Sequence, residues 1–149
     1  MTAQPLVVSP ADRSPSLNVV GEQITVLAAG TQTGSYEIFL QVGPEGSGPP
    51  PHNHPWDEAF YVIRGEVAFA VGDDERMAVP GTLVQIPGGT THWFRFGPGG
   101  GEMLSLTSRA GAAAFFTEVD RTIAPQAPDL GKLIGIAEAH GLRVPLTAP

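Results

Sequence analysis

Apolar and polar residues alternate over short segments between residues 17 and 108 of the chain. Alternation with a period of two is typical of strands that bury one face. The pattern predicts strands at residues 17–20, 23–28, 35–42, 58–63, 66–71, 82–86, 92–96 and 103–108. Most of these segments are bounded by Gly, Pro or Asp, and Gly72-Asp73-Asp74 has the composition of a hairpin turn. We therefore expect a compact antiparallel β-unit.

The two ends of the chain differ from this central region. Residues 1–16 contain three prolines and are expected to form a flexible N-terminal arm, while residues 17–108 form the β-unit. Helical spacing replaces alternation at residues 110–122 and 129–140, with Asp129 as an N-cap and Gly141 as the residue that closes the last helix. Residues 109–149 are thus expected to form a short helical appendix packed on the β-unit.

Composition excludes several classes of protein. A length of 149 residues favours one domain with a real core, and the lack of cysteine excludes disulfides and thiolate metal sites. A net charge of −7 with only eight Lys and Arg argues against nucleic acid and anionic membranes as partners. No apolar run reaches the roughly 20 residues of a membrane span, and no secretion signal is recognisable. We expect a cytoplasmic protein.

Three of the four histidines are spaced as metal ligands. His52 and His54 are two residues apart, so in a strand both imidazoles would point to the same side, and Glu58 would share that side if the strand continued. His92 must arrive from another strand. Three imidazoles and one carboxylate suit Fe, Ni, Co, Mn, Zn or Cu and leave coordination positions open, as in catalytic sites.

The aromatic residues around these ligands are candidates for a substrate pocket. Phe60 has the same parity as Glu58, and Phe94 and Phe96 have the same parity as His92, so they are expected to wall the site. Trp56 is expected to act either as a lid over the site or as a contact between subunits.

The motifs identify a family resemblance. The chain resembles the cupins, whose first motif, G-x5-H-x-H-x3–4-E-x6-G, is matched at Gly46, His52, His54, Glu58 and Gly65. The second motif, G-x5-P-x-G-x2-H-x3-N, is matched at Gly81, Pro87, Gly89 and His92, but Phe96 replaces its last residue. The resemblance covers residues 35–108 and implies a jelly-roll barrel (a double-stranded β-helix), one divalent transition metal per chain and a homodimer. The C-terminal segment looks like that of small bacterial cupins that are quercetin-dioxygenase-like.

Three functions are compatible with this site. The first is a metal-dependent dioxygenase acting on a small enolic, phenolic or flavonol-like compound, with Glu58 as a fourth ligand that also takes the proton of the substrate. The second is a non-oxidative cyclase or isomerase of a polyketide-like substrate, in which the metal is a Lewis acid. The third is a cupin that binds a small molecule without turnover. The sequence names neither the metal nor the substrate.

Overall fold

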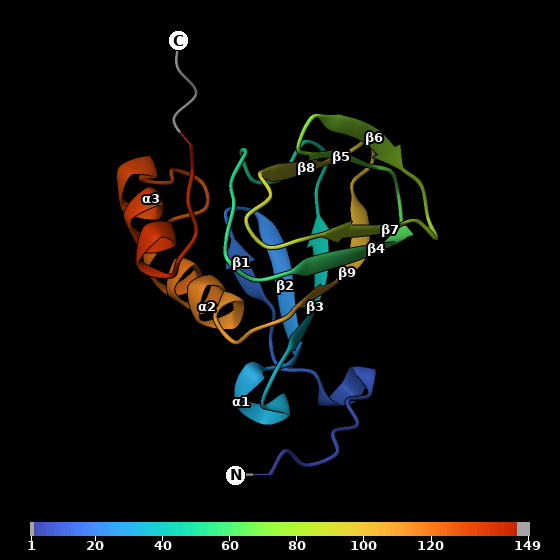
Figure 1. Cartoon of the computed structure of the whole chain (residues 1–149), viewed down its shortest axis with the longest axis vertical. Coiled ribbons are helices and arrows are strands. Elements are labelled where there is room, and N and C mark those ends of the chain that lie inside the picture. The colour runs from blue at the N-terminus through green and yellow to red at the C-terminus, as the bar shows by residue number, and fades with distance from the viewer. Residues whose placement is uncertain (1, 146–149) are drawn as a thin grey trace.

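The computed structural model describes residues 2–145 and confirms an all-β protein with a short helical C-terminal region (Figure 1). The expected residue 1 of the arm and residues 146–149 of the appendix lie outside the described residues. The strands are β1 (Leu17–Val19), β2 (Glu22–Ala28), β3 (Glu37–Gly43), β4 (Glu58–Arg64), β5 (Val67–Val71), β6 (Asp74–Ala78), β7 (Leu83–Ile86), β8 (His92–Phe96) and β9 (Gly101–Thr107). The helices are α1 (Gly30–Thr33), α2 (Ala112–Thr122) and α3 (Leu130–Ala139), with a 3-10 turn at Pro10–Asp12.

The strands form two antiparallel sheets that face each other over part of their area. The large sheet has the order β1-β2-β3-β9-β4-β7, and the small sheet has the order β6-β5-β8. The segment that follows β3 extends the small sheet irregularly, because Gly46 N donates to Phe96 O at 2.8 Å and Phe96 N donates to Ser47 O at 2.9 Å. This arrangement is the jelly roll that the family resemblance implies.

The inner face of the large sheet is covered by two separate apolar clusters. The barrel cluster lies between the large and the small sheet and consists of Phe60, Val62, Val67, Phe69, Ala78, Ile86, Phe94, Phe96 and Met103. The helix cluster lies between β2, β3 and the two C-terminal helices and consists of Ile24, Phe39, Trp56, Ala112, Phe115, Val119, Ile123, Ile136, Ala137 and Leu142. Figure 1 shows α2 and α3 beside β1 and β2, away from the small sheet.

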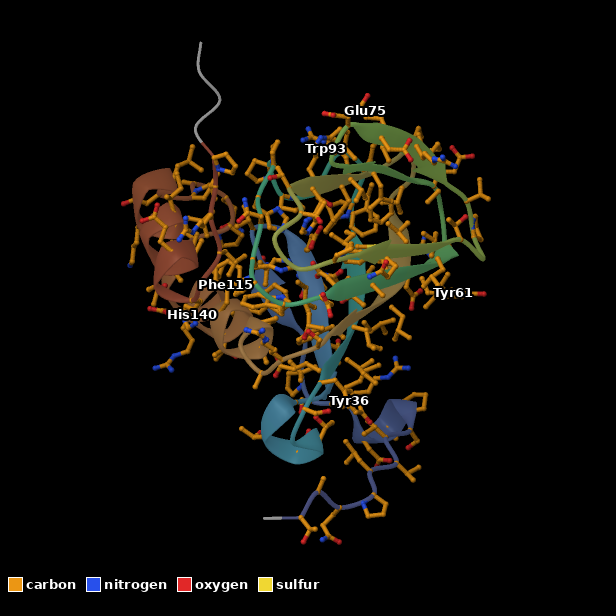
Figure 2. The ribbon with its side chains drawn as sticks, in the orientation of Figure 1. Tyr36, Tyr61, Glu75, Trp93, Phe115 and His140 are labelled. Carbon is orange, nitrogen blue, oxygen red and sulfur yellow. The ribbon has the colours of Figure 1, made fainter. Side chains whose placement is uncertain are left out.

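The C-terminal helices begin and end close to the expected residues. The Asp129 carboxylate accepts a hydrogen bond from Lys132 N at 3.0 Å, which confirms it as the N-cap of α3. Gly141 has a φ of 88°, the left-handed conformation that favours glycine after a helix. His140 at the end of α3 bonds Glu118 of α2 at 2.6 Å, and Figure 2 shows it next to Phe115 where the two helices meet.

Two elements differ from the sequence-based expectation. Asp74, expected to belong to the hairpin turn Gly72-Asp73-Asp74, instead begins β6 (Asp74–Ala78), which pairs with β5 through Val71 and Asp74. The first four residues of β6 are exposed on an edge strand, so no alternation marks them. The short helix α1 was also missed, because four residues carry too little periodicity. Within the described residues, no helix is long and apolar enough to cross a membrane.

Candidate metal centre

The four expected ligands come together, although the first two do not lie in a strand. His52 is held by a bridge to the first residue of β8, in which His52 N donates to His92 O at 3.0 Å and His92 N donates to His52 O at 2.9 Å. Asn53 forms a second bridge, with Arg143 beyond α3. The expectation that one strand runs from His52 to Glu58 is therefore wrong, because the chain turns between residue 54 and the start of β4.

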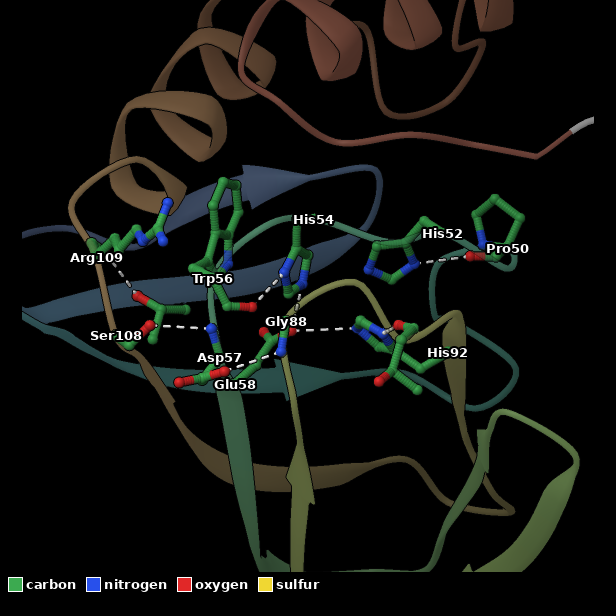
Figure 3. Close-up of polar contacts among 12 residues, drawn as sticks. Pro50, His52, His54, Trp56, Asp57, Glu58, Gly88, His92, Ser108 and Arg109 are labelled. Carbon is green, nitrogen blue, oxygen red and sulfur yellow. Dashed lines mark hydrogen bonds and ion pairs between the residues drawn. The ribbon is translucent and has the colours of Figure 1, made fainter.

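We call His52, His54, Glu58 and His92 the ligand cluster. One donor atom from each residue lies within 4.8 Å of the others, and the three imidazoles are buried. Glu58 Oε2 is 2.8 Å from His54 Nε2 and 3.2 Å from His92 Nε2 (Figure 3). The four side chains converge from one motif loop, which carries His52 and His54, and from the first residues of β4 and β8.

The orientation of each imidazole is set by a main-chain carbonyl. Nδ1 of His52 lies 2.9 Å from Pro50 O, Nδ1 of His54 lies 3.0 Å from Trp56 O, and Nδ1 of His92 lies 2.8 Å from Thr90 O. A carbonyl oxygen can only accept, so in each ring Nδ1 carries a proton, which leaves Nε2 as the atom that would bind a metal ion. The three imidazoles and the Glu58 carboxylate face one another, so a cation bound among them would be held by all four residues. Such support of the ligating histidines is typical of metal sites.

The pKa values of Glu58 and His52 favour the protonation states that bind a cation. Burial alone would raise the pKa of Glu58, but its hydrogen bonds with His54 and His92 outweigh burial and lower that pKa to about 2. Burial, helped by the nearby His92, lowers the pKa of His52 to about 4. The carboxylate is therefore ionised and the His52 ring neutral at neutral pH, the forms that bind metal ions. The donor set fits a divalent transition metal.

The two motif loops interlock behind the ligands. Gly88 N donates to the Asp57 carboxylate at 2.9 Å, and Gly89 N donates to His54 O at 2.8 Å. A Cβ atom at Gly88 would lie 2.3 Å from Pro55 O, so only glycine allows this approach. Gly89 has a positive φ, 84°, a conformation that glycine adopts without steric cost. Sequence analysis did not assign a role to Asp57, since a lone acidic residue in a loop carries no periodic signal.

The expected pocket aromatics have different environments. The Trp56 ring stacks on the His54 ring at 4.4 Å with an interplanar angle of 7°, and it is covered by the helix cluster of its own chain. Trp56 is therefore neither an exposed lid nor an exposed subunit contact, because α2 and α3 already bury it. Phe60 and Phe94 follow Glu58 and His92 on their strands, and their rings lie 5.3 Å apart in the barrel cluster. Phe96 is also buried, with its ring against Gly43.

Comparison with known proteins places this site in a family. Residues 39–106 match the model of the cupin domain. The chain is 28% identical over 102 residues to quercetin 2,3-dioxygenase of Bacillus subtilis, a match covering 66% of this chain and 30% of that protein. The chain thus spans less than a third of that relative.

Solved structures share the fold at low sequence identity. An RmlC-like cupin from Shewanella frigidimarina is similar with a TM-score of 0.65 and 17% identity, over 74% of this chain and 96% of that one. The polyketide cyclase RemF from Streptomyces resistomycificus is similar with a TM-score of 0.60 and 20% identity, over 70% of this chain and 80% of that one. Together with both motifs and the jelly roll, these matches show that residues 39–106 form a cupin domain and that the fold of the chain is similar to that of solved cupins.

Proposed function

We propose that the protein is a metal-dependent dioxygenase acting on a small enolic, phenolic or flavonol-like compound, with His52, His54, Glu58 and His92 as the metal ligands. The observation that carries the proposal is the ligand cluster, in which one nitrogen from each of three imidazoles and one carboxylate oxygen converge in a buried position. Similarity to a quercetin 2,3-dioxygenase supports an oxidative reaction and this substrate class. A divalent transition metal in this cluster would supply a Lewis acid for an ionised substrate oxygen and an open position for dioxygen.

Within this proposal, Glu58 takes the proton of the substrate hydroxyl as the general base. Its Oε2 atom lies at the centre of the cluster, within hydrogen-bond distance of two imidazoles. Phe60 and Phe94 line the interior next to Glu58 and His92, where they would exclude water and accept a planar ring. The backbone carbonyls that bond the Nδ1 atoms keep the imidazoles fixed while the proton moves.

Elemental analysis combined with an oxygen electrode tests the proposal. We expect about one Fe, Ni, Mn, Co or Cu ion per chain, and oxygen uptake with flavonols or enols as substrates. His52→Ala should lose both metal and activity. Glu58→Gln should keep most of the metal but lower turnover by about 10²- to 10⁴-fold, the usual contribution of a general base.

Two results would contradict parts of the proposal. Equal loss of metal and turnover in Glu58→Gln would exclude the base role and leave Glu58 as a ligand only. Stoichiometric Zn with product formation under strict anaerobiosis would instead favour the non-oxidative cyclase or isomerase. Absence of any bound metal would favour a cupin that only binds its ligand.

We also infer that the protein is a homodimer. The outer face of the large sheet supports this, because Tyr61 pairs with Leu83 across β4 and β7, and both side chains are exposed, as is Leu106 on β9. Apolar side chains on adjacent strands make a surface that a second copy of the chain could cover. A monodisperse monomer at micromolar concentration in light scattering would contradict this inference.

A further inference from the structure

The segment between β3 and β4 that carries two of the four ligands is paired with the rest of the chain on two sides. We call residues 52–56 the ligand loop. His52 N donates to His92 O at 3.0 Å, and His92 N donates to His52 O at 2.9 Å. Asn53 pairs with a second segment, because Asn53 N donates to Arg143 O at 2.9 Å and Arg143 N donates to Asn53 O at 2.8 Å. Figure 3 shows the chain after α3 running alongside the ligand loop.

The end of α3 fixes the course of this second segment, residues 141–143, which we call the C-terminal strap. Gly141 has a φ of 88°, in the left-handed region that favours glycine. Gly141 N donates to Glu138 O at 3.0 Å, and Leu142 N donates to Ala137 O at 2.9 Å. These two bonds form a Schellman motif, a common way of ending a helix. The strap therefore leaves α3 in a defined direction, with its last residue against the ligand loop.

Side chains of the strap and of the ligand loop also pack together. Leu142 is buried in the helix cluster, which also contains Trp56. A Cβ atom at Gly141 would lie 3.8 Å from the Trp56 ring and 3.9 Å from Pro55 Cδ, so these residues are direct neighbours of the strap. Since the Trp56 ring stacks on His54, the strap lies against the residues that follow the second ligand as well as against the residue that precedes it.

The main-chain bonds of the strap lie between the two ligands. Within residues 2–145, five main-chain hydrogen bonds join the ligand loop to other segments, and two of them come from the strap. The Asn53 N–H belongs to the peptide group that follows His52, and the Asn53 carbonyl belongs to the peptide group that precedes His54. The strap thus bonds both peptide groups that connect the two histidines, and these groups set the orientation of one imidazole relative to the other.

We propose that the C-terminal strap positions His52 and His54 for metal binding, by fixing the two peptide groups between them. A ligand set binds its metal well only when the surrounding structure holds each side chain close to the required geometry. The strap acts through the main chain and is not itself a ligand. It lies outside residues 39–106, the matched domain, so this support belongs to the C-terminal region of the chain. The inference rests on the proposed metal ligands but not on the proposed reaction.

A matched pair of substitutions at Arg143 tests the role of the main chain. Arg143→Pro removes the N–H group that donates to Asn53 O, because proline has no main-chain N–H. Arg143→Ala removes only an exposed side chain and keeps both main-chain bonds. Affinity for Co²⁺ is measured under anaerobic conditions by competition with a chelator. We expect Arg143→Pro to bind Co²⁺ about 10- to 100-fold more weakly than the wild type, and Arg143→Ala to bind it equally well.

The metal-free protein gives a second measurement of the same effect. Nuclear magnetic resonance of the imidazole nitrogens reports the protonation and the hydrogen bonding of each ring. The signals of His52 and His54 should be the same in the wild type and in Arg143→Ala. They should differ in Arg143→Pro, since the main chain that holds the two rings is released on one side. A change in stability alone would not move these signals while the protein stays folded.

Two truncations keep the test valid if Arg143→Pro does not fold, as judged by circular dichroism. A chain that ends at Leu142 lacks both hydrogen bonds to Asn53 and should show the weaker Co²⁺ binding and the altered imidazole signals. A chain that ends at Pro145 keeps the strap and should match the wild type in both measurements.

The outcomes separate this inference from the proposed function. Equal Co²⁺ affinities and equal imidazole signals in Arg143→Pro and Arg143→Ala would overturn the positioning role, as would an equal loss of affinity in both. A wild type that does not bind Co²⁺ would overturn the proposed ligands and this inference with them. Failure of oxygen uptake, with the difference between the two variants intact, would overturn only the dioxygenase, because Co²⁺ binding is measured without dioxygen.

Discussion

The two halves of the large sheet are covered by different structures, and the ligand cluster lies where they meet. The half formed by β4, β7 and β9 packs on the small sheet through the barrel cluster. The half formed by β2 and β3 packs on α2 and α3 through the helix cluster. Residues 39–106, the matched cupin domain, contain all of the first half except Thr107, but only most of β3 and Trp56 of the second.

Each half supports different ligands. Glu58 and His92 are the first residues of β4 and β8, and the next inward residues of those strands, Phe60 and Phe94, belong to the barrel cluster. His54 instead stacks on Trp56, which belongs to the helix cluster. The C-terminal helices are therefore part of the support of the candidate metal site, although the cupin motifs lie outside them.

Removal of one ligand from each half gives the largest expected effect. His54→Ala and His92→Ala should each reduce bound metal from about one ion per chain to a small fraction, since both halves are needed to complete the set. Elemental analysis after dialysis checks this. His140→Ala, at the histidine outside the cluster, should retain the metal. Retention by His54→Ala alone would show that the helix-covered half is dispensable for metal binding.

Cavities in the two clusters test whether the halves fold together. Phe60→Ala should lower the free energy of unfolding by about 3–5 kcal/mol, and Ile136→Ala in α3 by about 2–5 kcal/mol. If the halves are one cooperative unit, both variants show a single transition in urea, followed by circular dichroism. A separate early transition in Ile136→Ala would mean that the helices detach before the barrel unfolds.

Glu22 predicts a pH dependence that originates in the helix-covered half. Burial raises its pKa to about 8 in the folded protein from near 4.5 in the unfolded chain, so the folded state holds an extra proton between these values. Its contribution to stability is complete below pH 4.5 and is lost as pH rises through 8, by up to a few kcal/mol.

Urea unfolding of wild type and Glu22→Gln at several pH values isolates this contribution. Between pH 4.5 and 8, the free energy of unfolding of Glu22→Gln should rise relative to that of the wild type. Glu75→Gln, at an exposed position on β6, is the matched control. A difference that does not vary with pH would exclude a protonated Glu22.

Trp56 gives the smallest effect and the most direct measure of coupling between the halves. Trp56→Ala removes the ring that holds His54 and should weaken metal affinity by about 10- to 100-fold, as for other groups that orient a ligand. Competition with a chelator measures this affinity. Trp93→Ala, on the opposite side of β8 from His92, should leave it unchanged. Equal affinities in both variants would show that Nδ1 bonding alone orients His54.

The ligands were predictable from sequence because their spacing and the flanking glycines repeat a family motif, whatever the local backbone does. The strand geometry assumed for His52 and His54 was wrong, yet the two bridges to His92 and Arg143 still place both rings together. Strand β6 was not predicted, because an exposed edge strand has no buried face to impose alternation of apolar and polar residues.

The orientation of β3 shows why the interior was harder to predict. Its apolar residues Ile38, Leu40 and Val42 alternate with Glu37 and Gln41, a pattern that predicts the polar residues outside. The structure instead buries Glu37 and Gln41 together with Phe39. Glu37 is bonded by the main-chain N–H groups of Gly30, Gly111 and Ala113, which only the tertiary structure brings to it. A sheet that is apolar on both faces does not reveal which face is inward.

The carbonyl groups that hold the three imidazoles have a consequence for mutational mapping of this centre. No side-chain substitution deletes a carbonyl oxygen, so an alanine scan across residues 50, 56 and 90 would leave the tautomer of every ligating histidine intact. Alanine scanning of the whole centre would therefore detect only the ligand side chains and the stacked Trp56. It would miss the contribution of the main-chain carbonyl groups. Replacing single peptide bonds by esters weakens the carbonyl oxygen as a hydrogen-bond acceptor. Such replacements would show how much each carbonyl group contributes to the orientation of its histidine.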